Sequence, residues 1–294
     1  MRREHAVVGV LFVLLVGGVY AQRQPRRVPE QDPGYESPSE NIERHLSQLK
    51  MLDIPATREK LPADVSDIYR RPTKSELAAV EPSAEITKEY AAAIQSSNAG
   101  LLKLNSSTKC LNDRGVVSAD AECAKYNFPG AGTAYSFRVG AYRTPRLSDL
   151  ALKGKVLMSV SVLQHGILVR LGDVRLEDLK LDSPGVAYMA GLPLAKNKET
   201  FDAIDQQLTA GIKHDGYLYR MGVVLEPNTT YALRSTAYRG SSMQNAGGRS
   251  YDEFEFDRRG DVIVVFRVVD IDPAGNPTIL WRELSRNEAP KLKL

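Results

Sequence analysis

The chain has 294 residues, with 39 Lys and Arg against 36 Asp and Glu, four His and two Cys. A formal charge of +3 is too small to indicate a dedicated nucleic-acid-binding protein. Two Cys cannot build a disulfide-dense miniprotein or a four-cysteine zinc site. The shares of hydrophobic and charged residues are ordinary for a globular protein. The composition therefore does not indicate a particular activity.

Residues 1–21 have the pattern of a secretory signal peptide. A basic start, Met1-Arg2-Arg3, precedes the apolar run Ala6–Val19, and Val19 and Ala21 lie three and one residues before a predicted cleavage point. The apolar run is shorter than the roughly 20 residues that a membrane-spanning helix needs, so an uncleaved anchor is the weaker alternative. The sequence therefore predicts a secreted or periplasmic protein with no transmembrane span after signal removal.

Two segments separate the signal from the main domain. Residues 22–40 are rich in Pro and poor in apolar residues, which predicts a disordered tether. Residues 41–98 form a predicted helical N-terminal region. Its first helix begins after Asn41, and its last runs from Ser83, as the cap, to about Gln95.

The pattern changes after residue 98, and residues 99–290 predict a β-rich domain. The segment 155–171 is interpreted as two strands joined by a turn at Gln164–Gly166. Apolar residues at helical spacing predict one inserted helix over 199–212. Segment 261–271 is apolar on both faces, which is typical of a central or sandwiched strand. Further strands are predicted over the ranges 133–139, 217–225, 230–238 and 278–284.

These elements predict an α+β fold. A short helical N-terminal region precedes a mostly antiparallel β-rich domain with one inserted helix. The hairpins favour a sandwich or open sheet, and a barrel-like sheet is the alternative.

Cys110 and Cys123 are the only cysteines, with twelve residues between them in a polar segment. In an oxidising compartment this spacing predicts a disulfide that closes a surface loop. Such a bond contributes roughly 3 kcal/mol of stability by restricting the unfolded chain.

Between His214 and Pro290 the sequence has nine Arg and no Lys, together with five Tyr and the single Trp. Arg forks bind carboxylates and phosphates, and Arg also stacks on aromatic rings. A candidate binding surface is therefore assigned to Arg220, Arg234, Tyr238, Arg239, Arg267 and Trp281. Eleven acidic residues share the segment, and paired surface charge is the favoured explanation of the arginines, with the binding surface as the alternative.

His165 and His214 are the only histidines in the predicted domain. Either could act as a general base beside a carboxylate, for which Asp149, Asp173 and Asp215 are candidates. No nucleophile motif accompanies them. The acidic run Asp252–Asp257 is interpreted as the wet face of an edge strand instead of a calcium site, so neither a metal nor a cofactor is expected.

The expected function is non-enzymatic binding or scaffolding outside the cytoplasm, through the β-rich domain. The candidate partners are an envelope protein or an anionic glycan, and no nucleic acid is expected. The alternative is a secreted hydrolase that uses His165 or His214 with a carboxylate.

Overall fold

The computed structural model describes residues 63–106, 109–110, 117–246 and 248–293. The chain divides into two units, Met1–Ser37 and Pro38–Leu294, and every described residue lies in the second. The predicted signal peptide, the tether and the helix expected after Asn41 lie outside the described residues.

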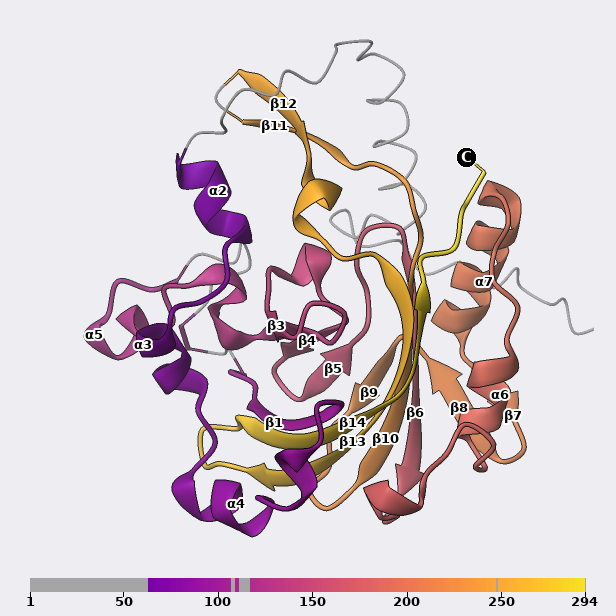
Figure 1. Ribbon diagram of the computed structural model, residues 1–294, viewed down its shortest axis with the longest axis horizontal. Helices are drawn as coiled ribbons and strands as arrows, with labels where there is room; N and C mark the ends of the chain where they lie inside the picture. The colour runs from indigo at the N-terminus through magenta and orange to yellow at the C-terminus, as the bar shows by residue number, and fades with distance from the viewer. Residues whose placement is uncertain (1–62, 107–108, 111–116, 247, 294) are drawn as a thin grey trace, which may run out of the picture. The chain divides into compact units, whose positions relative to one another are not determined.

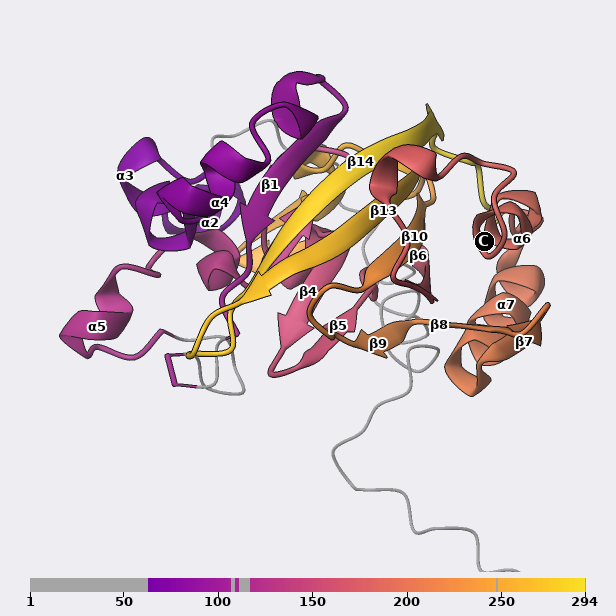
Figure 2. The same ribbon diagram turned by 90° about the horizontal axis from the view of Figure 1, so that it is seen from below.

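A sheet of seven antiparallel strands lies at the centre of this unit (Figures 1 and 2). In spatial order its strands are β1 (Ala99–Lys103), β14 (Pro277–Glu288), β13 (Gly260–Ile271), β10 (Thr230–Ala237), β6 (Gln164–Gly172), β8 (Tyr217–Arg220) and β7 (Ile212–His214). A second antiparallel sheet packs against one of its faces. Its strands are β3 (Ala141–Tyr142), β2 (Ala134–Ser136), β4 (Leu150–Lys153), β5 (Val156–Met158) and β9 (Gly222–Val224). The predicted α+β, mostly antiparallel fold is confirmed, in its sandwich form.

Helices and one hairpin surround the two sheets. The hairpin consists of β11 (Met243–Ala246) and β12 (Arg249–Asp252). The α-helices are α2 (Ala63–Tyr69), α3 (Lys74–Leu77), α4 (Ala84–Glu89), α5 (Ala121–Ala124), α6 (Val186–Gly191) and α7 (Lys198–Ala210). The 3₁₀ helices are η1 (Ala78–Val80), η2 (Ala93–Gln95), η3 (Pro129–Gly132), η4 (Pro145–Leu147), η5 (Leu176–Asp178) and η6 (Glu253–Phe256). Within the described ranges, no helix has the length and apolar character needed to span a membrane.

Strand β13 explains why the central sheet is apolar on both faces. Val262, Val264 and Phe266 pack into the core between the two sheets. The alternating residues Ile263 and Val265 pack into a second core, beneath helices α6 and α7. Figure 1 shows these helices on the side of the large sheet that faces away from β3, β4 and β5. The sequence prediction of a sandwiched central strand is confirmed.

The inserted helix forms as α7, which begins at Lys198, directly after its N-cap residue Asn197. The Asn197 side chain accepts a hydrogen bond from the Thr200 amide, and the Thr200 hydroxyl accepts one from the Asn197 amide. Such reciprocal caps stabilise a helix start by about 1 kcal/mol. Phe201 and Leu208 are its buried residues, as the helical spacing predicts.

The predicted turn at Gln164–Gly166 is wrong, because these residues begin the continuous strand β6. The chain bends earlier, around Leu163, which has a positive φ of 50°. Gly166 lies inside the strand because the Ser159 backbone passes close to it: a Cβ at Gly166 would be 2.0 Å from the Ser159 carbonyl oxygen. Gly166 is therefore needed because two backbone segments lie close together there, and it does not form a turn.

Two further strand predictions need correction. Segment 217–225 forms two strands in different sheets, since β8 pairs with β6 whereas β9 pairs with β5. The acidic run forms η6 instead of an edge strand, because the Asp252 carboxylate caps the Phe254 amide. Glu253 is buried there and accepts a bidentate contact from Arg146, at 2.6 and 3.1 Å.

The predicted disulfide is present between Cys110 and Cys123. Cys123 is buried in α5, and Cys110 packs against the core between the sheets. The Ser118 amide donates to the Cys110 carbonyl at 2.7 Å, close to the bond. The disulfide therefore links α5 to a residue that packs against the core.

Candidate anion-binding site

The site is built on Arg138, a buried arginine that directly follows Phe137 beyond β2. Its guanidinium contacts Asp149 at 3.2 Å and Asp257 at 3.3 Å, and donates to the Gln164 side chain at 2.8 Å. The side chain of Arg138 is only 1% exposed, and those of the two aspartates are fully buried. A buried guanidinium needs such partners, because its desolvation is costly.

Asp149 connects the two sheets through further hydrogen bonds. It accepts from the Ser235 hydroxyl of β10 at 2.5 Å and from the Ser136 hydroxyl of β2 at 3.1 Å. The Arg138 amide also donates to it at 3.0 Å. The carboxylate is thereby held from both sheets, and it fixes the position of Arg138.

Arg259 forms a second inward-facing arginine at the start of β13. Its guanidinium contacts Asp257 at 3.1 Å, donates to the carbonyls of Tyr238 and Leu163, and stacks on the Phe254 ring at 3.9 Å. Burial, followed by the nearby charge of Arg138, lowers the pKa of Arg259 to about 10. It therefore remains charged at neutral pH.

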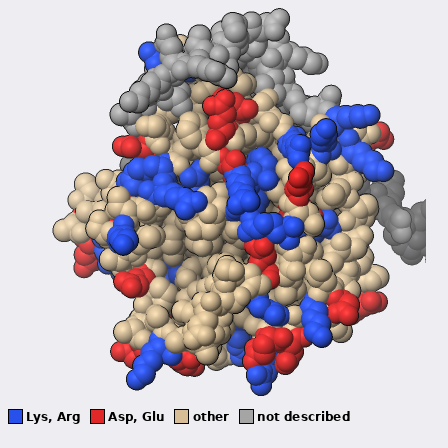
Figure 3. All heavy atoms as spheres, in the orientation of Figure 1, with Lys and Arg blue, Asp and Glu red and all other residues tan. Residues whose placement is uncertain are grey.

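These two arginines form the inner wall of a cavity of about 420 Å³. Three more arginines line it, and the remaining lining residues include one acid. These residues are Arg239, Arg258 and Arg286, with Gly260, Val262, Asn287, Glu288 and Ala289. Figure 3 shows Lys and Arg side chains gathered near the middle and upper right of the face seen in Figure 1. We call this cavity the arginine pocket.

Charges around the arginine pocket do not cancel. Asp149 and Asp257 compensate the two inner arginines, and Glu283 contacts Arg286 through two hydrogen bonds. Arg239 pairs with Glu288 at 2.8 Å, but Glu288 is 90% exposed. Arg258 is exposed and has no ion pair or hydrogen bond among the described residues. One positive charge is therefore left over, and one ion pair is exposed enough to exchange with an incoming anion.

Arg286 shows how the rim of the arginine pocket is held. From β14 its guanidinium donates to the backbone carbonyls of Arg138 and Phe137, at 3.0 and 2.9 Å. These bonds join the large sheet to the end of β2. The rim is thus preorganised, which reduces the entropy lost when a ligand binds.

The six residues predicted as a binding surface do not lie together, and only Arg239 lines the arginine pocket. Arg234 and Tyr238 are buried, so they are not accessible as a surface. Arg234 contacts Asp261 through two bonds of 3.0 Å and donates to the carbonyls of Met189 and Leu192. It joins α6 to the large sheet.

The other three predicted residues lie apart from the arginine pocket. Arg267 pairs with Asp173 at 2.7 Å. Trp281 is half-buried against Phe137, and Arg220 is exposed on β8. Arg138, Arg258, Arg259 and Arg286 are residues of the pocket that the predicted surface lacks. The Arg258–Arg259 doublet directly before the apolar strand is a sequence signal that could have identified two of them.

His165 is buried in a closed hydrogen-bond network. Its Nε2 donates to the Phe201 carbonyl at 3.0 Å, and its Nδ1 accepts from the Tyr238 hydroxyl at 3.0 Å. That hydroxyl in turn accepts from the Ala195 amide at 3.0 Å. Both ring nitrogens are therefore used in positioning α7 against β6, and the imidazole is neutral.

Burial lowers the pKa of His165 to about 4, against 6.5 in an unfolded chain. Its contribution to folding is complete above pH 6.5 and is lost progressively as the pH falls toward 4, because the unfolded chain then binds the proton more tightly. We expect acidification over this range to lower the free energy of unfolding by at most about 3 kcal/mol through His165. Urea unfolding between pH 7.5 and 4.5 measures the loss.

The control for this prediction is His165→Gln, whose stability should change less over the same pH range. Asp205 acts in the opposite direction, because burial and the charge of Asp202 raise its pKa to about 6. The comparison is therefore best made in an Asp205→Asn background. Equal pH dependence with and without the imidazole would contradict the assignment.

His214 lies in a different environment, at the exposed edge strand β7. Its ring stacks on Tyr188 with centroids 4.1 Å apart, and its Nε2 lies 3.3 Å from Asp215. The sequence neighbours His214 and Asp215 do therefore contact each other. Among the described residues, neither histidine has a hydrogen bond to a serine or a cysteine.

The other carboxylates considered for a hydrolase are committed to arginines. Asp149 belongs to the buried network of Arg138, and Asp173 pairs with Arg267. The part of the chain that the structure describes holds no group of three or more His, Cys, Asp or Glu side chains arranged for a metal ion. Comparison with protein-family models, with curated proteins and with solved structures gives no match to this chain.

Proposed function

We propose that this chain is an exported binding protein that takes an anionic glycan in the arginine pocket. The observation that carries the proposal is the pocket itself, in which five arginines line one cavity and Arg258 lacks a partner among the described residues. The carboxylates or sulfates of a glycan can accept two hydrogen bonds from the planar guanidinium of an arginine. The sugar rings of the glycan would occupy the cavity between the arginines.

Two features support the location in which such binding would take place. The Cys110–Cys123 disulfide is stable in an oxidising compartment outside the cytoplasm. Residues 1–21 have the basic start, apolar run and small residues before a cleavage point that are typical of a signal peptide. We therefore propose that the protein acts in the periplasm or after secretion, and that it binds without chemical turnover.

The mechanism of binding follows from the charges of the arginine pocket. Arg138 and Arg259 are held by buried aspartates and act as a fixed positive wall. Arg258 supplies the uncompensated charge. An incoming carboxylate would replace Glu288 beside Arg239, exchanging an exposed ion pair for a less exposed one. Affinity should therefore fall as salt increases.

The expected result for Arg258→Ala is at least a ten-fold loss of affinity for tetragalacturonate, because one charge-assisted contact is removed. Isothermal titration of the purified full-length chain measures it. Arg220→Ala is the matched control, since Arg220 is an exposed arginine outside the arginine pocket. Maltotetraose, a neutral sugar with the same number of rings, should bind more weakly than tetragalacturonate.

A second variant separates binding from a structural effect. Glu288→Gln removes the acid that competes for Arg239, so affinity for tetragalacturonate should rise several-fold. A merely structural role of this rim would not produce a gain. Equal affinity for the charged and neutral sugars, or equal losses in Arg220→Ala and Arg258→Ala, would contradict the proposal.

A further inference from the structure

A second cavity, of about 590 Å³, lies between residues 71–82 and the edges of the two sheets. One wall comes from α3, η1 and the residues on either side of them. The other comes from β1, β2 and β3, with Leu102, Tyr135 and Tyr142. It shares no lining residue with the arginine pocket, so the two sites are separate. We call it the helix–edge groove.

The floor of the helix–edge groove is apolar and continuous with the core. Leu102 and Val80 are buried members of the core between the two sheets, and Leu77 packs against it. The ring of Tyr135 packs edge-on against Phe137 and Tyr142, with centroids 5.3 Å apart in each case. This floor is a preformed apolar surface against which the apolar part of a ligand can pack, as is common in small-molecule sites.

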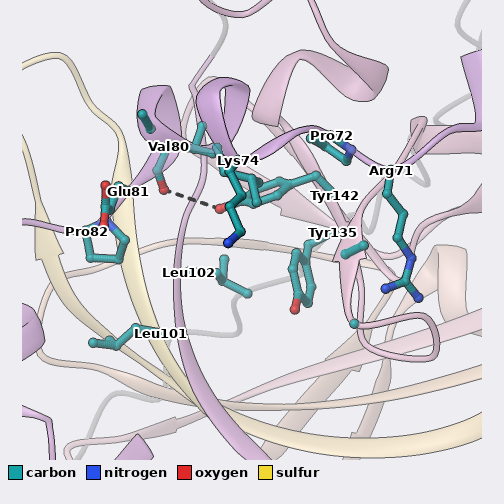
Figure 4. A pocket seen from close by; sticks show the side chains of 14 residues that line it. Arg71, Pro72, Lys74, Val80, Glu81, Pro82, Leu101, Leu102, Tyr135 and Tyr142 are labelled. Atoms are coloured by element: carbon teal, nitrogen blue, oxygen red, sulfur yellow. Dashed lines mark hydrogen bonds between the residues drawn. The ribbon is translucent and has the colours of Figure 1, made fainter. Parts of the chain in front are cut away.

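Donors above this floor outnumber the acceptors. The Lys74 amine and the Tyr135 hydroxyl have no hydrogen bond or ion pair among the described residues. Arg71 uses one nitrogen to donate to the Val139 carbonyl at 3.1 Å. Figure 4 shows Lys74 reaching toward the middle of the groove, with Tyr135 beside it and Arg71 beyond, whereas Glu81 lies on the opposite side.

The two tyrosines of the helix–edge groove differ in how their hydroxyls are used. The Tyr142 hydroxyl donates to the Lys103 carbonyl at 2.8 Å and accepts from the Lys103 amide at 3.2 Å, so it is committed to β1. The Tyr135 hydroxyl has no such role. Burial, followed by the charge of Asp149, raises the pKa of Tyr135 to about 12, so this hydroxyl is a donor at neutral pH.

We propose that the helix–edge groove binds an amphipathic monocarboxylate, a small acid with one carboxylate and an aliphatic body. The carboxylate would be held by Lys74, the Tyr135 hydroxyl and Arg71. The aliphatic body would cover Leu77, Leu102 and Val80. Charge complementarity selects this occupant, because two cations and a neutral donor face an apolar floor with Glu81 as the one acid in the lining.

Titration of the full-length chain with octanoate tests the proposal. Octan-1-ol is the control that has the same aliphatic chain without the charge, and acetate is the control that has the carboxylate without the long chain. We expect octanoate to saturate one site, and octan-1-ol and acetate to bind at least ten-fold more weakly. Lys74→Gln should lower the octanoate affinity about ten-fold and leave that for octan-1-ol unchanged. Tyr135→Phe should lower the octanoate affinity about three-fold.

Lys88→Gln is the matched control, since Lys88 is an exposed lysine of α4 that does not line the helix–edge groove. It should leave all three affinities unchanged. Absence of octanoate binding, equal binding of octan-1-ol, or equal effects of the two lysine variants would overturn the proposal. Tetragalacturonate should not compete with octanoate, so failure here is distinguishable from failure of the arginine pocket.

Discussion

Gly166→Ala is expected to destabilise the protein by about 3 kcal/mol or more, at the upper end of overpacking effects. The added Cβ would lie 2.0 Å from both the backbone oxygen and the Oγ of Ser159, and 2.4 Å from its Cβ. The Ser159 backbone cannot move away easily, because its amide donates to the Met221 carbonyl at 2.8 Å. The clash therefore displaces β6, the strand that pairs with both β10 and β8.

Urea unfolding at pH 7.5 measures this effect, with Gly191→Ala as the control. Gly191 lies in α6, and a Cβ there would meet nothing within 4 Å. Its substitution should change the free energy of unfolding little, since alanine is also the better helix former. Similar stabilities for the two variants would show that Ser159 does not constrain β6.

The second large effect is expected from Asp149→Asn, which should cost about 3–5 kcal/mol of stability. The change keeps the size of the side chain but removes one of the two carboxylate charges that compensate Arg138, whose side chain is only 1% exposed. The hydroxyls of Ser136 and Ser235 also lose their charged acceptor. Both sheets contribute to this network, so its loss should weaken their packing.

An exposed ion pair provides the control for Asp149→Asn. Arg170 and Glu226 lie 2.6 Å apart, but their side chains are 53% and 51% exposed. Glu226→Gln should cost less than about 1 kcal/mol, because solvent screens the pair. If chemical denaturation gives the two variants equal losses, the buried network has no special role in stability.

Local patterns in the sequence were enough to predict several elements. Segment 261–271 is apolar on both faces, which identified β13 as a central strand. Apolar residues at helical spacing identified α7. The segment Asp272-Pro273-Ala274-Gly275-Asn276 after β13 is composed of residues typical of turns, and it forms a tight hairpin loop. In this loop the Asp272 side chain accepts from the amides of Ala274 and Asn276 at 2.9 Å. The disulfide followed from the spacing of two cysteines. Each of these depends on interactions within a short segment or on one local pattern.

Elements decided by distant contacts were not predictable in the same way. Gln164–Gly166 has the composition of a turn, but the Ser159 backbone and pairing with β10 hold it as a strand. The acids of 252–257 look like a solvated face. Instead, Glu253 and Asp257 are buried, because Arg146 and Arg259 reach them from other elements.

The same reason explains why the arginine pocket was only partly predicted. Arg138 and Arg286 are 148 residues apart in the chain, and the Arg286 side chain bonds to the Arg138 carbonyl because β14 passes the end of β2. The sequence marked an arginine-rich segment but could not show which side chains face inward. Arg234 points into the fold, whereas Arg258, one residue before the inward-facing Arg259, remains exposed.

The most direct test of the central claim is nitrogen NMR of the arginine side chains during titration with tetragalacturonate. The guanidinium Nε signals of Arg258, Arg239 and Arg286 should shift together and saturate at one equivalent of ligand. Those of Arg220, exposed elsewhere, and Arg234, buried against Asp261, should remain unchanged. Uniform shifts across all exposed arginines, or none at Arg258, would contradict the assignment of the arginine pocket as the binding site.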